Sequence, residues 1–343
     1  MTGATAAVTE VRPTPESVHW GFQDGKLEPS FEIPDGGTVR VRTIQGGLDD
    51  PVPDHWLADD IREIIESDVP RGPGPHILTG PIAVQGAQVG DVLSIDVLDI
   101  RFGAPYGLNL MRPGKGLFPD ALDPSVEVDK VAIPIDSEQR TGRVPPGIDI
   151  ALRPFFGIIA TAPPLSWGTV STVEPRANGG NVDCKELIAG SRLFLPVFVP
   201  GANVSVGDGH AAQGDGEMNQ TAVETCLEGD LRIRVEPDLR LDHPLAITPA
   251  GLVSMGFADD LETAARTAAD QLLTFLEAHC GLPWMEGYRL ASLSVDLRIT
   301  QVVNRVVGVH AVLPHDVLKQ LDTPDWLATP PPEPDPVSLP GGT

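Results

Sequence analysis

Apolar and polar residues alternate over several short segments of the chain, as expected for strands with one buried and one solvated face. The alternation is clear over residues 38–42, 231–236 and 293–300. The runs 92–100 and 306–312 are apolar almost throughout, which is typical of central strands that are covered on both faces. The pattern therefore predicts an extensive and mostly antiparallel sheet system.

One long segment follows a helical period instead. After the acidic pair at 259–260, which can cap a helix, apolar residues recur at helical spacing from Leu261 to His279, and Gly281 ends the run. A shorter helix is predicted over residues 57–66, where isoleucines form a stripe. The predicted fold class is mainly β with a few helices, in which the long helix packs across a sheet.

Composition supports an architecture of many turns and short strands. Glycine and proline contribute 36 and 35 of the 343 residues, and 41% of the chain is hydrophobic, enough for a sizeable core. We expect a loose arm over residues 1–16, a single catalytic unit over 17–322 with a division into lobes considered near residue 150, and a proline-rich tail over 323–343. Within that tail, Trp326 and Leu327 could dock on the body or on a partner subunit.

Charge narrows the range of partners. The chain has 24 basic and 48 acidic residues, a net charge of −24, which would repel nucleic acid and anionic membrane surfaces. No secretion signal or apolar membrane-spanning run is recognisable. The three cysteines form no CxxC pair, so reduced thiols and a cytoplasmic location are expected.

The densest chemistry lies between Asn178 and Glu224. Five ionisable residues flank an apolar run at 193–199 that could hold both flanks in one sheet. They are Asp183, Asp208, His210, Asp215 and Glu217. Any single Gly-Asp pair here is more often a turn than a ligand, but carboxylates and imidazole gathered together can bind a metal ion or move protons.

Spacing divides these residues into pairs. Asp208 and His210 are two apart, so in an extended segment both side chains leave the same face and could bind one ion. The same argument puts Asp215 and Glu217 together, either as further ligands or as a proton-transfer pair. Spacing alone does not identify which carboxylate touches a metal.

Several separate motifs together resemble the acetamidase/formamidase family. The central ones are Gly179-Gly180-Asn181-Val182-Asp183, Ala189-Gly190-Ser191, Leu195-Pro196-Val197, Gly207-Asp208-Gly209-His210 and Ala212-Gln213-Gly214-Asp215-Gly216-Glu217. His76 before Thr79-Gly80-Pro81-Ile82, the run 86–91 and the run 295–303 agree with them. The resemblance covers roughly residues 17–320. It implies a β-rich fold with β/α/β layering of sandwiched sheets, a metal-assisted site, and hydrolysis of small linear amides to a carboxylate and ammonia.

Carried onto this chain, the resemblance implies roles for nine residues. The expected metal ligands are Asp183, Asp208 and His210. The expected catalytic residues are Glu217, Asp215 and His76, with His76 as a further ligand or as a donor to the substrate carbonyl. The expected oxyanion and substrate contacts are Gly214, Gly216 and Asn181, although turn geometry explains the two glycines equally well. Mixed imidazole and carboxylate ligands suit zinc, with calcium as the alternative.

Two other interpretations are open. Cys184, beside Lys185 and Glu186, suggests a thiol-dependent amidase, although three consecutive side chains on a strand do not converge on one substrate. A catalytically inactive metal- or small-molecule-binding β protein would need the same glycine-rich cavity. Ammonia release with and without a chelator separates these possibilities.

Substrate and assembly are constrained only weakly. The resemblance implies a homodimer or a higher homo-oligomer. Residues 108–118, with Arg112 and Lys115, and the segment 218–220 differ from common members of the family. Positive charge in the first of these segments would suit an acidic or larger substrate, and the alternative is a solvated loop.

Overall fold

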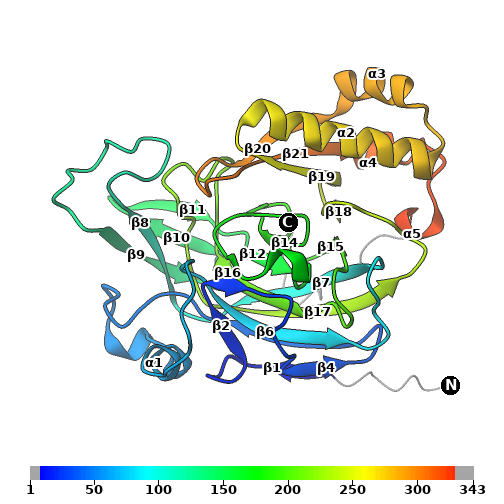
Figure 1. Ribbon diagram of the computed structural model, residues 1–343. Coiled ribbons are helices and arrows are strands. Elements are labelled where there is room, and N and C mark those ends of the chain that lie inside the picture. Colours follow the sequence, from blue (N-terminus) through cyan, green and yellow to red (C-terminus); the bar gives the residue numbers. More distant parts are fainter. Residues whose placement is uncertain (1–7, 329–343) are drawn as a thin grey trace.

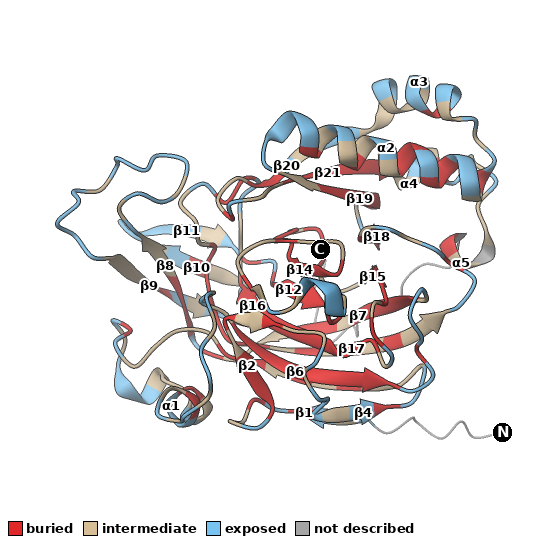
Figure 2. Cartoon of the chain, in the orientation of Figure 1, coloured by how far each residue is buried: buried red, intermediate tan, exposed pale blue. Residues whose placement is uncertain are grey.

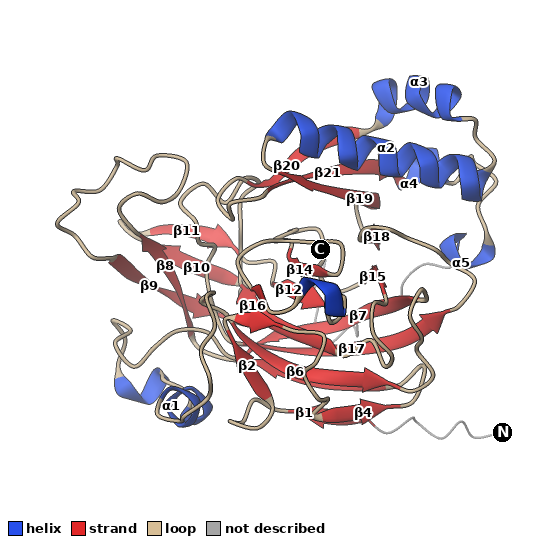
Figure 3. Ribbon diagram, in the orientation of Figure 1, coloured by secondary structure: helices blue, strands red, loops and turns tan. Residues whose placement is uncertain are grey.

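The computed structural model describes residues 8–328, in which strands outnumber helices and form several largely antiparallel sheets (Figures 1 and 3). A nine-stranded sheet has the spatial order β1 (Val8–Val11), β5 (Thr38–Thr43), β17 (Leu227–Glu236), β7 (Val92–Phe102), β15 (Ser191–Pro196), β18 (Leu245–Thr248), β19 (Gly251–Ala258), β21 (Val307–Pro314) and β20 (Asp296–Gln301). A six-stranded sheet has the order β14 (Gly179–Asn181), β12 (Phe155–Ala160), β16 (Val204–His210), β6 (Ile77–Val84) and β2 (Val18–Trp20), with β4 (Phe31–Ile33) also paired to β6.

Two smaller sheets complete the β structure. One consists of β11 (Ile148–Ala151), β10 (Thr141–Val144), β9 (Asp129–Asp136) and β8 (Tyr106–Met111), and it lies to one side of the larger sheets (left in Figure 1). The other pairs β13 (Val170–Ser171) with β3 (Phe22–Gln23). Among the described strand pairs, β1–β5 and β4–β6 are parallel and the others are antiparallel, which confirms the predicted sheet type.

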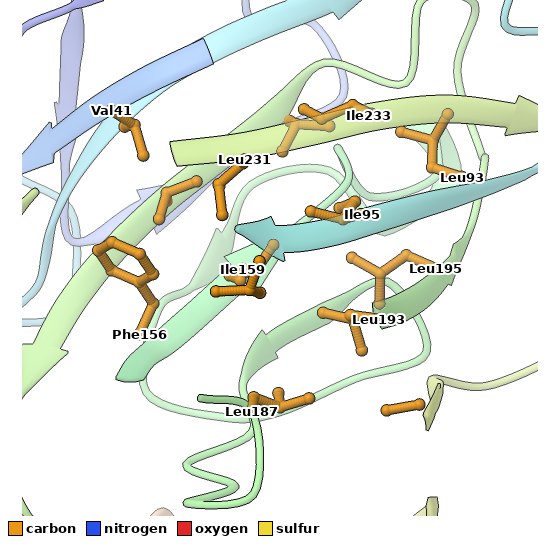
Figure 4. Packing of buried hydrophobic residues seen from close by; sticks show 14 of the residues in the cluster. Val41, Leu93, Ile95, Phe156, Ile159, Leu187, Leu193, Leu195, Leu231 and Ile233 are labelled. Carbon is orange, nitrogen blue, oxygen red and sulfur yellow. The ribbon is translucent and has the colours of Figure 1, made fainter. Parts of the chain in front are cut away.

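The main hydrophobic core lies between the nine-stranded and six-stranded sheets (Figure 4). Ile95 and Leu193 from the first sheet pack in one cluster with Phe156 and Ile159 from the second. Strand β7 is buried on both faces and sits between β17 and β15, as its continuous apolar sequence predicts. Figure 2 shows this burial as a band of buried strands through the middle of the molecule.

Helix α2 (Leu261–Cys280) has the predicted bounds and caps. The Asp260 carboxylate accepts a hydrogen bond from the Thr263 backbone N–H at 2.9 Å, and Gly281 ends the helix in a left-handed conformation. A buried stripe that includes Ala268 and Leu272 packs on β19 and β21. Alternate residues of those strands face the central core, so the layers follow the order helix, sheet, sheet at this end of the molecule.

The other helices are shorter. They are α1 (Asp59–Ile65), α3 (Trp284–Ser294), α4 (His315–Leu318) and α5 (Asp325–Ala328), with 3₁₀ turns at Asp54–Trp56 and Leu165–Trp167. Helix α1 confirms the prediction over residues 57–66. The strand predicted over 293–300 is wrong at its start, because 293 and 294 end α3, which packs on α2, and β20 begins at Asp296. None of the helices in residues 8–328 is long and apolar enough to cross a bilayer.

Both ends of the described chain are packed, which corrects the two predicted boundaries. Val8–Val11 form β1 beside β5, and the Val11 side chain is fully buried in the core, so the loose arm predicted over 1–16 does not include these residues. At the other end, α5 docks on the body through Trp326, whose ring lies 5.3 Å from that of Phe194, and through buried Leu327. The remainder of both predicted segments, 1–7 and 329–343, lies outside the described residues.

Candidate active site

The end of strand β16 carries the first pair of site residues. Asp208 and His210 are both buried, and Nε2 of His210 lies 3.3 Å from Oδ2 of Asp208. The structure thus brings together the pair whose spacing predicted a shared face. Asp183, which follows β14, completes the predicted set, because its Oδ1 lies 3.9 Å from Nδ1 of His210.

Neighbouring amides fix the orientation of these groups. Gln213 donates through Nε2 to the Asp183 carbonyl at 2.8 Å, so its Oε1, which lies 3.0 Å from Nδ1 of His210, is an acceptor. His210 therefore carries a proton on Nδ1 and directs Nε2 toward the carboxylates. Asn304 donates to Oδ2 of Asp183 at 2.5 Å, which leaves Oδ1 without a hydrogen-bond partner among the described residues.

Glu224 is a further member of the cluster that the sequence did not single out. Its Oε2 lies 3.2 Å from Nε2 of His210, and Gln45 donates to the same oxygen at 3.0 Å. The backbone of Glu224 bridges β16 and β8 through pairs with His210 and Leu108. The available signal was its place at the end of the acid-rich segment, but it belongs to no Gly-Asp motif.

Glycine at position 157 on β12 makes room for the cluster. A Cβ atom on Gly157 would lie 2.5 Å from Oδ2 of Asp208 and 2.6 Å from Oδ1 of Asp183, which is closer than any real Cβ contact. No local motif marks this position, because its importance comes from the strand pairing between β12 and β16.

Three of the acidic residues hold backbone conformations that are rare outside glycine. Asp183, Asp208 and Glu217 have φ values of 49°, 56° and 45°. Each such residue costs on the order of 1–3 kcal/mol and persists where the surrounding structure imposes it, most often at functional sites. The strain therefore marks these residues as a site that the fold maintains at the expense of local stability.

The pKa values of the clustered carboxylates are shifted in opposite directions, upward by burial and mutual repulsion and downward by nearby histidine charge. Burial, reinforced by the charge of Asp208, raises the pKa of Asp183 well above its ordinary value. Burial and the charge of Asp183 do the same to the pKa of Glu217. Burial would also raise the pKa of Asp208, but the charges of His210 and His76 outweigh it and hold that pKa below its ordinary value.

The carboxylates around His210 favour a second proton on its ring, at the same Nε2 atom that would have to lose the proton to bind a metal ion. Burial would lower the pKa of His210, yet the charges of Glu224 and Asp208 outweigh burial and raise the pKa well above the ordinary value. One imidazolium cannot balance four buried carboxylates, so bound protons or a bound cation must supply the remaining positive charge.

The donor set fits a divalent metal ion. There are two groups of three residues that share His210, and within each group the ligand atoms lie within 4.8 Å of one another. They are Asp183, Asp208 and His210, and His210, Glu217 and Glu224. Oδ1 of Asp183, Nε2 of His210 and Oε2 of Glu217 are buried and have no hydrogen-bond partner among the described residues. Mixed oxygen and nitrogen ligands with unused lone pairs are what a first-row divalent ion binds.

A cavity of about 360 Å³ opens above the cluster. Asp208, Glu217 and Glu224 contribute to its lining, and so do His76 and Asn181. Its size suits a small organic molecule. The cavity therefore connects the buried carboxylates to solvent.

The structure brings two other predicted residues to this cavity. Nε2 of His76 lies 3.8 Å from Oδ1 of Asp208, and its Nδ1 is 3.0 Å from the hydroxyl of Thr172. Asn181 donates to the Val173 carbonyl at 3.1 Å, and its buried Oδ1 has no hydrogen-bond partner among the described residues. Both side chains are thus held in place beside the cluster.

Asp215 does not join Glu217, which corrects the predicted pair. The Asp215 carboxylate is partly exposed and lies 3.0 Å from Nζ of Lys185, while Glu217 is buried in the cluster. The positive φ values of Gly216 and Glu217 break the extended conformation that the spacing argument assumed. The two side chains therefore leave the backbone in different directions.

Neither of the two predicted oxyanion glycines is among the residues that line the cavity. The Gly216 N–H donates to the Thr300 carbonyl at 3.2 Å, so it is not free to bind an oxyanion. Gly214 is exposed, and its carbonyl accepts the Glu217 N–H at 3.2 Å. Both glycines shape the turn that carries Glu217 into the cluster.

Cys184 lies away from the cavity. Its side chain is fully buried in the main core, and burial raises the pKa of the thiol to about 12. A thiol of that kind stays protonated at neutral pH and is a poor nucleophile.

The fold and the site together define a mainly β protein with a buried carboxylate and imidazole cluster beneath a small-molecule cavity. A model of the family described as Acetamidase/Formamidase matches residues 16–168 and 165–320. The chain belongs to the acetamidase/formamidase family.

Individual relatives agree with this assignment. The chain is 32% identical over 206 residues to an acetamidase of Mycolicibacterium smegmatis (42% of this chain, 49% of that protein). It is 30% identical over 230 residues to a formamidase of Methylophilus methylotrophus (53% and 55%). The chain thus spans about half the length of the curated relatives it matches.

Solved structures cover more of the fold. An acetamidase from Bacillus halodurans superposes with a TM-score of 0.78 at 27% identity, over 91% of this chain and 99% of that one. A gamma lactamase from Delftia acidovorans, at 23% identity and a TM-score of 0.55, over 89% of this chain and 90% of that one, shares the fold alone.

Proposed function

We propose that this chain is an amidohydrolase that cleaves the C–N bond of small linear amides with metal-activated water. The single observation that carries the proposal is the buried cluster at the floor of the cavity. Asp208, Glu217 and Glu224 form that floor, and they share two overlapping sets of close ligand atoms with His210 and Asp183 behind them. Membership of the acetamidase/formamidase family supports amides as the substrate class.

The residues that would hold the ion are Asp183, Asp208, His210 and Glu224. A bound divalent ion supplies Lewis-acid polarisation of the amide carbonyl and lowers the pKa of water, with zinc favoured by the mixed donors. Gln213 and Asn304 orient the ligands by holding the His210 tautomer and the Asp183 carboxylate.

Glu217 is the proposed proton-transfer residue. It lines the cavity, and burial together with the charge of Asp183 raises its pKa, which favours a carboxyl group that can hold and then release a proton. In hydrolysis it would take a proton from the attacking water and return it to the departing amide nitrogen. His76, whose Nδ1 is engaged by Thr172, would orient the amide carbonyl through Nε2.

The test measures metal content by elemental analysis and ammonia release from formamide and acetamide, with and without a chelator. The proposal expects bound divalent metal and release that the chelator abolishes and added metal restores. Glu217→Gln should retain metal and fold while losing about 100-fold or more of turnover, and the exposed Glu63→Gln serves as the matched control. Release that survives metal removal would overturn the metal route.

The thiol alternative is weaker, because burial holds the Cys184 pKa at about 12. Cys184→Ala should therefore remain active. Loss of activity with metal and fold intact would favour the thiol. A well-folded protein that binds metal and releases no ammonia from any amide would favour the catalytically inactive binding protein.

A further inference from the structure

Two cations line the rim of the cavity without a carboxylate partner. Arg112 follows β8 directly, and the Lys115 backbone N–H donates to the Arg112 carbonyl at 3.2 Å, so a tight turn presents both side chains to the cavity. In the part of the chain that the structure describes, no acidic side chain lies within ion-pair distance of either residue. Both are exposed, so neither charge is neutralised by its surroundings.

Lys130, the third cation on the cavity wall, is a useful contrast. Its Nζ lies 3.0 Å from an oxygen of Asp49 and 3.1 Å from one of Asp50, so it is fully paired. The chain has twice as many acidic as basic residues, 48 against 24, so carboxylates are available to pair surface cations. Among the described residues, exposed cations without a carboxylate partner also occur elsewhere, for example Arg289 and Lys319, but Arg112 and Lys115 both line the mouth of one cavity, where a negatively charged ligand can reach them.

A backbone hydrogen bond ties the loop that carries Arg112 and Lys115 to the segment that carries Glu217, the proposed proton-transfer residue. The Leu117 N–H donates to the Met218 carbonyl at 2.7 Å, and Met218 directly follows Glu217. The Asn109 and Asn219 side chains are also hydrogen-bonded, at 2.7 Å. These contacts therefore fix the backbone of the turn relative to Glu217.

We propose that this rim is a carboxylate subsite and that the substrate is an amide bearing a carboxylate at its other end, that is, a monoamide of a dicarboxylic acid. The inference rests on the proposed amidase function of the same cavity. The acidic floor would repel an anion placed on it, so the carboxylate lies at the rim and the neutral amide reaches the floor. A singly charged group is favoured over a phosphate, because repulsion by the floor grows with charge.

The reaction balances without a further reactant. Water adds its oxygen to the amide carbon, the C–N bond breaks, and the nitrogen leaves as ammonia after taking a proton. At neutral pH the products are a dicarboxylate and ammonium. The second carboxylate is unchanged and serves only for binding.

The experiment compares two substrates of similar shape and different charge on the metal-loaded protein. Succinamate carries the carboxylate, and 4-methylpentanamide has an uncharged isopropyl group in its place. We expect kcat/KM to favour succinamate by about tenfold or more, mainly through KM, because two exposed cations bind one carboxylate only modestly. The preference should shrink as salt is added.

Charge-removing variants test the residues. In the double variant Arg112→Gln and Lys115→Gln, the ratio of the two kcat/KM values should fall about tenfold and lose its salt dependence. The matched control is Arg289→Gln with Lys319→Gln, two exposed cations that do not line the cavity. A ratio near one in the native protein, or a ratio that the double variant leaves intact, would overturn the subsite.

Failure of the two proposals is distinguishable. Turnover of acetamide without any preference for succinamate refutes the subsite and leaves the amidase function standing. If no amide is hydrolysed, the amidase function fails, and calorimetric binding of succinamate, which is then not consumed, tests the carboxylate subsite at the rim separately. Binding that the double variant weakens about tenfold supports the subsite, and absence of binding refutes it.

Discussion

The carboxylate cluster under the cavity and the packing of α2 on β19 and β21 follow opposite physical rules. Around α2 every local preference agrees with the fold: an acidic cap begins the helix, a glycine ends it, and an apolar stripe is buried. In the cluster, buried carboxylates crowd together, three residues have positive φ, and ligand atoms are unpartnered. The first region stabilises the fold, and the second uses that stability to hold a reactive arrangement.

Among substitutions that test this difference between the two regions, the largest loss of activity is expected at Asp208. Asp208→Asn keeps the shape and tolerates the positive φ, but it removes a ligand charge. We expect about a 10³-fold loss of amide hydrolysis together with loss of bound metal, since even partners of ligands contribute about 10–100-fold. Asp215→Asn is the matched control, because Asp215 pairs with Lys185 outside the cluster. Equal losses of activity in the two variants would contradict the assignment of Asp208 to the cluster and of Asp215 to its outside.

Leu272→Ala in α2 should produce the opposite result. The side chain is fully buried in the helix-on-sheet cluster. Truncation should lower the free energy of unfolding by about 2–5 kcal/mol through lost burial and a cavity, while kcat at permissive temperature stays within about twofold. Denaturant unfolding and ammonia release measure the two quantities. A large fall in kcat without a fall in stability would show that the regions are coupled.

His19 gives a pH-dependent effect on the strand that carries the site. Nε2 of His19 lies 2.9 Å from the Ser205 hydroxyl on β16, and burial lowers the pKa of His19 from 6.5 to about 4. Above pH 6.5 both folded and unfolded forms are neutral. As pH falls from 6.5 toward 4, only the unfolded form takes up the proton, so stability falls by up to about 3 kcal/mol. Unfolding curves for His19→Asn should show a shallower decline over this window, and equal slopes would contradict the assignment.

Gly157→Ala tests crowding at the cluster with a single methyl group. The new Cβ would collide with oxygens of Asp208 and Asp183, so the ligand set must move. We expect a loss of about 10–100-fold in activity and a weaker affinity for metal. The control is Gly214→Ala, whose added Cβ meets nothing within 4 Å. Metal titration of both variants separates site distortion from unfolding.

The smallest effect is expected at the α2 cap. Asp260→Ala removes the two hydrogen bonds that the carboxylate accepts from the Thr263 backbone N–H and hydroxyl, and it should lower stability by about 1 kcal/mol, with amide hydrolysis and metal content equal to those of the native protein. Thermal unfolding measures it, and a shift in metal content would show that the cap acts on more than the helix.

The same contrast explains which features the sequence could predict. The helix from Leu261 and the strands over 92–100 and 231–236 follow from periodicity and caps, which are local. The closeness of Asp208 to His210 followed from a spacing of two. The proximity of Glu224 and the need for Gly157 depend on pairing between distant strands, so no local pattern reveals them.

The wrong predictions have an equally physical origin. Asp215 and Glu217 were paired by assuming extended backbone, whereas Gly216 and Glu217 adopt positive φ. Val8–Val11 lack an apolar run of their own, but pairing with β5 supplies the hydrogen bonds that order them. Leu293 and Ser294 fit both alternation and a helix end, and only the contact between α3 and α2 distinguishes the two.

The hydrogen bond between Leu117 and Met218 anchors the loop that forms the rim, so the rest of this loop can vary independently of the cluster. The loop after β8 can change its length and charge beyond this anchor while Asp183, Asp208, His210 and Glu224 keep their places in the sheet and its connections. Selection, or a designer, could therefore exchange the selectivity of the cavity mouth independently of the chemistry beneath it. A transplanted loop that preserves the anchor would carry its preference for a substrate to another scaffold of the same fold.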